Sequence, residues 1–143
     1  MVSVALFAAD EDGVLVRLAL RESGMTTTGA YEMEVQSGAC DLHEFLQSSN
    51  PDVVIYDYVQ PGGRSTRRLD EVKRVCAKLE IPCVLTVRDV HDLQRIAVGW
   101  AACILIRPYD VDMARLAIRE ALQAGAGEEQ ADVDDDDGGD AAA

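Results

Sequence analysis

Residues 51–57 read Pro-Asp-Val-Val-Ile-Tyr-Asp, a short apolar run that starts after a proline and ends in an acid. Four consecutive apolar residues without polar alternation predict a strand that is buried on both faces. Strands of this kind are typical of a parallel sheet covered by helices on both sides. This stretch therefore predicts a central strand of an α/β fold.

Similar apolar runs lie on either side of this strand at residues 2–8, 82–87 and 102–106, while residues 28–35 can form a strand with only weak alternation, and helical patterns separate these segments. Strands are predicted over residues 2–8, 28–35, 82–87 and 102–106. Apolar residues at helical spacing follow each strand, and we expect these helices to lie within residues 14–24, 41–46, 69–79, 89–99 and 110–122. The alternation predicts an α/β fold with a doubly wound, five-stranded parallel sheet.

The charge of the chain divides at about residue 123. The 143 residues include 26 acids and 13 bases, but eight of the acids and none of the bases lie after residue 123. The 18 remaining acids leave residues 1–123 with a net charge of −5. We therefore expect one domain over 1–123 and an acidic, disordered tail over 124–143, which lacks the apolar residues for a core.

Composition also excludes several classes of function. An acidic body does not favour direct binding to nucleic acid, which requires a basic surface. No apolar run is long enough for a membrane helix, and residues 1–7 carry no basic signal region. Four widely spaced cysteines predict reduced thiols in a cytoplasmic protein.

Several polar residues stand at or near the ends of the predicted strands, where open parallel sheets bind their ligands. They are Asp10, Glu11, Asp57, Thr86 and Arg107. Clustered carboxylates suit a hard cation such as Mg²⁺, and a carboxylate can also act as the nucleophile in phosphoryl transfer. A hydroxyl and a guanidinium nearby would stabilise charge on phosphoryl oxygens.

The ordered set of these segments resembles the receiver domains of bacterial response regulators (CheY-like). The resemblance rests on residues 52–62 (Asp-Val-Val-Ile-Tyr-Asp-Tyr-Val-Gln-Pro-Gly), 84–86 (Val-Leu-Thr) and 106–110 (Ile-Arg-Pro-Tyr-Asp), and it covers about residues 2–123. It implies strand order 2-1-3-4-5 and a signalling switch in a two-component phosphorelay, rather than an enzyme with its own substrate.

The resemblance also implies roles for individual residues. Asp57 would accept a phosphoryl group from a histidine kinase or phosphotransferase protein and would also bind Mg²⁺, with Asp10, Glu11 and the backbone carbonyl of Val59 as further ligands. Thr86 and Arg107 would bind phosphoryl oxygens, and the peptide bond between Arg107 and Pro108 would be cis. A downstream effector would bind the face formed by the helices after the fourth and fifth strands. Because only the tail follows residue 123, output is expected through protein contacts, unless the chain is part of a longer protein.

Three departures from the family pattern leave a second function open. Arg107 replaces the usual lysine, Ile104 replaces the usual aromatic switch residue, and the loop after Pro61 lacks its usual acid. The alternative is a pseudo-receiver, a protein–protein interaction module that works without phosphorylation. A flavodoxin-like nucleotide-binding enzyme is the weakest candidate, because residues 10–13 are acidic where a glycine-rich phosphate loop would stand. Asp10, Glu11 and Asp12 could also simply cap the first helix.

Overall fold

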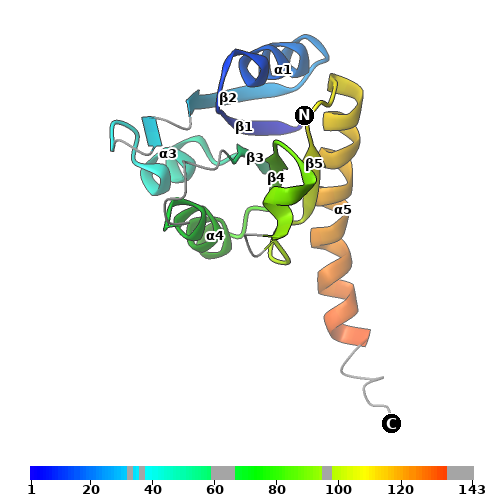
Figure 1. Cartoon of the computed structure of the whole chain (residues 1–143). Helices are drawn as coiled ribbons and strands as arrows, with labels where there is room; N and C mark the ends of the chain where they lie inside the picture. Colours follow the sequence, from blue (N-terminus) through cyan, green and yellow to red (C-terminus); the bar gives the residue numbers. More distant parts are fainter. Residues whose placement is uncertain (32–33, 36–37, 59–66, 95–97, 135–143) are drawn as a thin grey trace.

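The computed structural model describes residues 1–31, 34–35, 38–58, 67–94 and 98–134. Its elements alternate along the chain, and Figure 1 shows helices packed on both faces of one sheet. Among the described helices, none is both long enough and apolar enough to cross a membrane.

The sheet contains five parallel strands, as the sequence predicts. They are β1 (Ser3–Ala8), β2 (Thr26–Tyr31), β3 (Val53–Asp57), β4 (Cys83–Val87) and β5 (Cys103–Ile106). Their order in the sheet is β2-β1-β3-β4-β5, which confirms the expected 2-1-3-4-5 topology. This order places β3 at the centre of the sheet and β5 at one edge. The second strand lies earlier in the chain than predicted: the sequence predicts residues 28–35, whereas β2 spans Thr26–Tyr31.

The helices cover the sheet on two sides, each with its own apolar core. On one side α3 (Leu42–Ser49) and α4 (Arg67–Leu79) pack with Phe7 and Tyr56. On the other side α1 (Glu11–Glu22) and α5 (Val111–Asp134) pack with Leu6 and Ile55. Because successive residues of a strand face opposite sides, the unbroken apolar runs of β1 and β3 supply both cores.

Local capping explains where two of the helices begin. The side chain of Asp10 accepts a hydrogen bond from the Gly13 N–H at the start of α1, and Asp41 accepts one from the Glu44 N–H at the start of α3. Each cap satisfies a backbone donor that has no partner inside the helix.

The prediction of an α-helix after the fourth strand is wrong over residues 90–94. A short 3-10 helix, η1 (Val90–Gln94), replaces it, and Ile96 and Ala97 lie outside the described residues. The buried carboxylate of Asp92 accepts hydrogen bonds from the N–H groups of Arg88 and Asp89, and Asp89 accepts one from His91 N–H. These side-chain bonds hold the backbone in a tight turn and compete with an α-helix.

The last helix also differs from its prediction. We expected a tail without structure from residue 124, whereas α5 continues to Asp134 and extends beyond the sheet in Figure 1. The alanine, glutamate and glutamine residues of this stretch have high intrinsic helix propensity. Residues 135–143, the rest of the predicted tail, lie outside the described residues.

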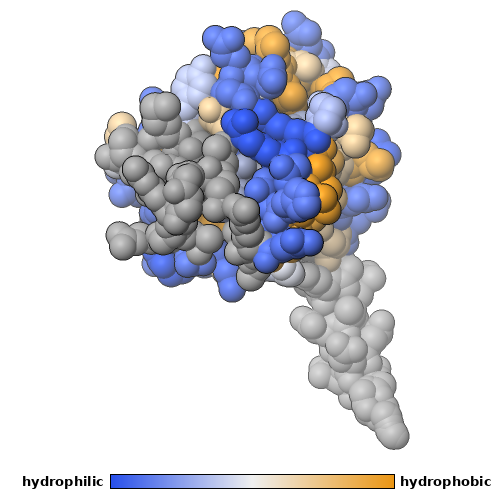
Figure 2. Space-filling model, in the orientation of Figure 1, coloured by the Kyte–Doolittle hydropathy of each residue, from blue (hydrophilic) through white to orange (hydrophobic). Residues whose placement is uncertain are grey.

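Hydrophobic residues are not confined to the two cores. Large apolar side chains are exposed on α1 (Leu15 and Leu18) and on α5 (Met113 and Leu116). Figure 2 shows hydrophobic patches toward α1 at the top of the view and toward α5 on its right.

Candidate functional site

Asp57 lies at the centre of a group of polar residues at the carboxyl end of β3. Its side chain is only 1% exposed. Asp57 is paired in register with Thr86 on β4, and the Thr86 hydroxyl donates a hydrogen bond of 2.8 Å to Asp57 Oδ1. The Ala9 N–H, just after β1, donates to Oδ2 at 3.0 Å. Neighbouring strand ends therefore hold this carboxylate from both sides.

Arg107 joins Asp57 to Asp10. The backbone N–H of Arg107 donates to the Val87 carbonyl, which continues the β4–β5 ladder past Ile106. From there its guanidinium donates to both oxygens of Asp10, with Nη1–Oδ2 and Nη2–Oδ1 distances of 2.8 and 2.9 Å. The same Nη2 also donates to Asp57 Oδ2. One planar fork thus bridges two carboxylates, a geometry that a lysine ammonium cannot reproduce.

Asp10 has two structural roles. It caps α1, as the simpler interpretation of the sequence suggests, and it also forms the bidentate ion pair with Arg107. The hydrogen bonds from Arg107 are the main reason why the pKa of Asp10 is lowered from 3.8 to about 2. Asp10 in turn is the main cause that raises the pKa of Arg107, so the pair remains charged across the ordinary pH range.

Glycine at position 13 allows α1 to approach this group closely. A Cβ there would lie 2.8 Å from the Cβ of Ala8 and 3.4 Å from Asp57 Oδ2. The first contact is shorter than carbon atoms tolerate, so any larger residue would push the first turn of α1 away from β1 and Asp57.

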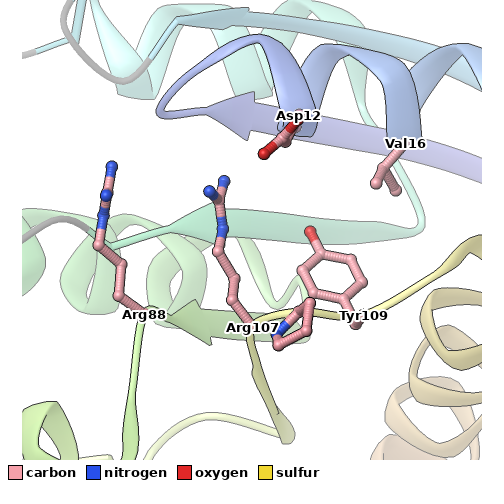
Figure 3. Close-up of a pocket in the computed structure, with 7 residues that line it drawn as sticks. Asp12, Val16, Arg88, Arg107 and Tyr109 are labelled. Atoms are coloured by element: carbon pink, nitrogen blue, oxygen red, sulfur yellow. The ribbon is translucent and has the colours of Figure 1, made fainter.

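A pocket of about 470 Å³ opens beside these residues. It is lined by the α1 residues Asp12, Gly13 and Val16 and by Arg88, Arg107, Pro108 and Tyr109 from the ends of β4 and β5. Figure 3 shows Arg88 and Arg107 extending side by side from the strand ends toward the start of α1. The peptide bond between Arg107 and Pro108 is cis, as predicted.

The structure brings together four of the predicted site residues. Asp10, Asp57, Thr86 and Arg107 are connected by direct hydrogen bonds or ion pairs. Glu11 is exposed in the first turn of α1, and Asp12 lines the pocket instead. Val59 lies outside the described residues.

Two residues of the site were not assigned a role from the sequence. Arg88 lies 3.6 Å from Asp10 Oδ2, and it could have been identified because it directly follows β4. Tyr109 is half-buried near Asp57. Its pKa is raised to about 12, first by burial and then by the negative charge of Asp57. Only its adjacency to Arg107-Pro108 marked it in the sequence.

The residues present do not fit a divalent metal as they are arranged. Carboxylate oxygens are suitable ligands for Mg²⁺, but Asp10 and Asp57 are already bridged by Arg107. Within the described part of the chain, no group of three or more His, Cys, Asp and Glu side chains is arranged to hold a metal ion.

Comparison with solved structures identifies the fold. A receiver domain protein from Clostridium thermocellum is 18% identical, with 87% of this chain and 96% of that chain covered and a TM-score of 0.65. The regulator TrrA from Thermotoga maritima, solved in complex with Mg²⁺-BeF, is 18% identical, with 85% and 100% covered and a TM-score of 0.65. A receiver protein from Sinorhizobium medicae is 21% identical, with 87% and 96% covered and a TM-score of 0.62.

Sequence comparison adds no further assignment, since neither a protein-family model nor a curated protein matches the chain. The three solved structures nevertheless align with this chain at TM-scores of 0.62 to 0.65. The chain has the CheY-like fold of response regulator receiver domains.

Proposed function

We propose that this protein is a phosphorelay receiver in which Asp57 accepts a phosphoryl group from a histidine kinase or phosphotransferase protein. One observation carries the proposal: a hydroxyl from β4 and a guanidinium from the end of β5 converge on the same buried carboxylate at the end of β3. A hydrogen-bond donor and a cation on either side of a carboxylate are the groups that stabilise a phosphoryl group attached to it.

Transfer requires the contacts around Asp57 to change. Asp57 Oδ2 accepts from Ala9 N–H and Arg107, and Oδ1 accepts from Thr86. Arg107 must leave Oδ2 for a donor to approach, and its guanidinium can then pair with the phosphoryl oxygens. Because Arg107 directly follows β5, we propose that this movement shifts the end of that strand. No step in this scheme is assigned to Mg²⁺, since in the resting structure Arg107 bridges the two carboxylates that would bind it.

The change in position of β5 would be the signal to an effector protein. We propose that the effector binds the surface formed by η1, β5 and α5, where Val90, Ile106 and Met113 are exposed. Phosphorylation adds charge beside this surface and shifts an existing equilibrium between two arrangements of it. In this proposal the protein is a switch in the cytoplasm, a location favoured by its four free cysteines, and not an enzyme with its own substrate.

Intact-mass spectrometry tests the proposal directly. The full chain is incubated with acetyl phosphate in a buffer that contains MgCl₂, so that neither a metal nor a kinase is limiting. We expect the mass of one phosphoryl group on the wild type and none on Asp57→Asn. An exposed acid serves as a matched control: Asp112→Asn on α5 should be labelled as the wild type is. A wild-type protein that is never labelled contradicts the proposal.

The second candidate, a pseudo-receiver, is favoured by the same Arg107 bridge. A guanidinium that holds both Asp10 and Asp57 makes a stable resting structure that needs no phosphoryl group to complete it. In that case Asp57→Asn would bind partner proteins with the same affinity as the wild type, and labelling would be absent.

A further inference from the structure

The carboxylates of Asp57 and Asp10 are already paired with cations of the chain itself. The two carboxylates carry two negative charges. Arg107 contacts both of them, and Arg88 lies 3.6 Å from Asp10, so two positive charges from the chain itself face them. Asp12 also lines the pocket beside Arg88 and Arg107, so the nearby charges do not cancel completely. A divalent ion placed between Asp10 and Asp57 would nevertheless lie directly against the Arg107 guanidinium, and this repulsion is strong in a partly buried site.

The geometry leads to the same conclusion. Nη2 of Arg107 donates to one oxygen of Asp10 and to one oxygen of Asp57, so it lies between the two carboxylates. A divalent ion shared by the same pair of oxygens would need this position. The side chain of Arg107 is only 16% exposed, and its fork is held at both ends. The ion could therefore bind only after Arg107 had been displaced.

We infer that Arg107 is the resident cation of this site and takes the place of a divalent metal between Asp10 and Asp57. The inference about metal binding stands on the resting structure alone. Its consequence for chemistry rests on the proposed function: the phosphoryl group is accepted on Asp57 without magnesium. With acetyl phosphate, the bond between phosphorus and the acetate oxygen breaks as the bond from Asp57 to phosphorus forms, and acetate leaves. Arg107 pairs with the phosphoryl oxygens throughout.

Metal binding is measured first, without any phosphoryl donor. The full chain is titrated with Mn²⁺, a paramagnetic probe for Mg²⁺ sites, and free Mn²⁺ is read by electron paramagnetic resonance. We expect wild type and Asp10→Asn to bind Mn²⁺ equally weakly at millimolar concentrations. Binding by the wild type that is lost in Asp10→Asn overturns the inference.

Removal of the guanidinium should create the metal site. We expect Arg107→Gln to bind Mn²⁺ about tenfold more tightly than the wild type or better, because one competing positive charge has been removed from between two carboxylates. The gain should disappear in the double variant Arg107→Gln, Asp57→Asn. The matched control is Arg74→Gln, which removes the same charge from an exposed position on α4 and should bind as the wild type does. Equal affinities in wild type and Arg107→Gln overturn the inference.

Circular dichroism checks that Arg107→Gln is folded. If this variant does not fold, the comparison of Mn²⁺ binding by wild type and Asp10→Asn tests the inference instead. A last measurement repeats the acetyl phosphate labelling with excess EDTA. Labelling that persists supports the inference, and labelling that EDTA abolishes overturns it. A wild type that neither binds Mn²⁺ nor accepts phosphate contradicts only the proposed function, so the two failures are distinguishable.

Discussion

The strands β3 and β5 both end at the site, but the fold holds them very differently. β3 lies between β1 and β4, and every one of its residues is buried. β5 is an edge strand that pairs only with β4, and in it only Leu105 is buried. Asp57 is therefore positioned by the core, whereas Arg107 depends on its ion pairs with Asp57 and Asp10. The end of β5 can therefore move while β3 stays folded.

The largest expected effect compares the same residue type in the two strands. Ile55 of β3 is fully buried, and Ile106 of β5 is 39% exposed. Ile55→Ala should lower the free energy of unfolding by about 2–5 kcal/mol because it removes packed core atoms. Ile106→Ala should lower it by about 0.5 kcal/mol or less. Urea denaturation measures both, and equal losses would remove the distinction between a fixed and a movable strand.

The next effect tests what holds the end of β5. Arg107→Ala leaves the buried carboxylate of Asp57 without its cation and should lower the free energy of unfolding by about 3 kcal/mol. Arg107→Lys keeps the charge without the fork and should lose less. The measurement is urea denaturation at neutral pH. If Arg107→Ala is as stable as the wild type, the ion pairs do not position β5 as described.

A smaller effect concerns the pH dependence of the Asp10 pair. The pKa of Asp10 is lowered to about 2 in the folded protein, below its ordinary value of 3.8. A lowered pKa stabilises the folded state above the unfolded value, and this contribution is lost as the pH falls from about 4 toward 2. Asp10 is 35% exposed, so screening reduces the contribution to about 1 kcal/mol.

The measurement compares the unfolding free energies of wild type and Asp10→Asn at pH 7 and pH 3. The wild type should be more stable at pH 7, and the difference should narrow at pH 3. A difference that grows as the pH falls would contradict the sign of this linkage.

The smallest effect is expected at Arg88. Its side chain is 50% exposed and lies 3.6 Å from Asp10. Surface ion pairs of this kind contribute little, so Arg88→Gln should change the free energy of unfolding by about 0.5 kcal/mol or less. A loss comparable to that of Arg107→Ala, measured in the same urea series, would show that Arg88 and not Arg107 holds Asp10.

Strand periodicity predicted the sheet well because its signal is local. Apolar runs such as residues 53–56 reveal a buried strand by themselves, and strand ends indicate where Asp57 and Thr86 meet. The helix expected after β4 failed for a different reason. The carboxylates of Asp89 and Asp92 accept hydrogen bonds from nearby backbone N–H groups. The spacing of apolar residues contains no information about such side-chain hydrogen bonds.

Four members of the candidate site were predictable from the sequence, but the contacts between them were not. Sequence placed Asp10 and Arg107 at the same edge of the sheet, although they are 97 residues apart. It did not show that the guanidinium reaches both carboxylates, because that depends on the length of the arginine side chain and on the position of β5. For the same reason it did not separate Glu11, which is exposed, from Asp12, which lines the pocket.

The Arg107 bridge also affects how strongly free ions in solution can compete for the oxygens of Asp10 and Asp57. A guanidinium tethered to the end of β5 is present at a fixed effective concentration, in the millimolar range or above for short connections. A free ion competes for the same oxygens only at its concentration in the surrounding solution. With its counterion covalently attached, the resting state of Asp57 is insulated from changes in the ionic composition of that solution.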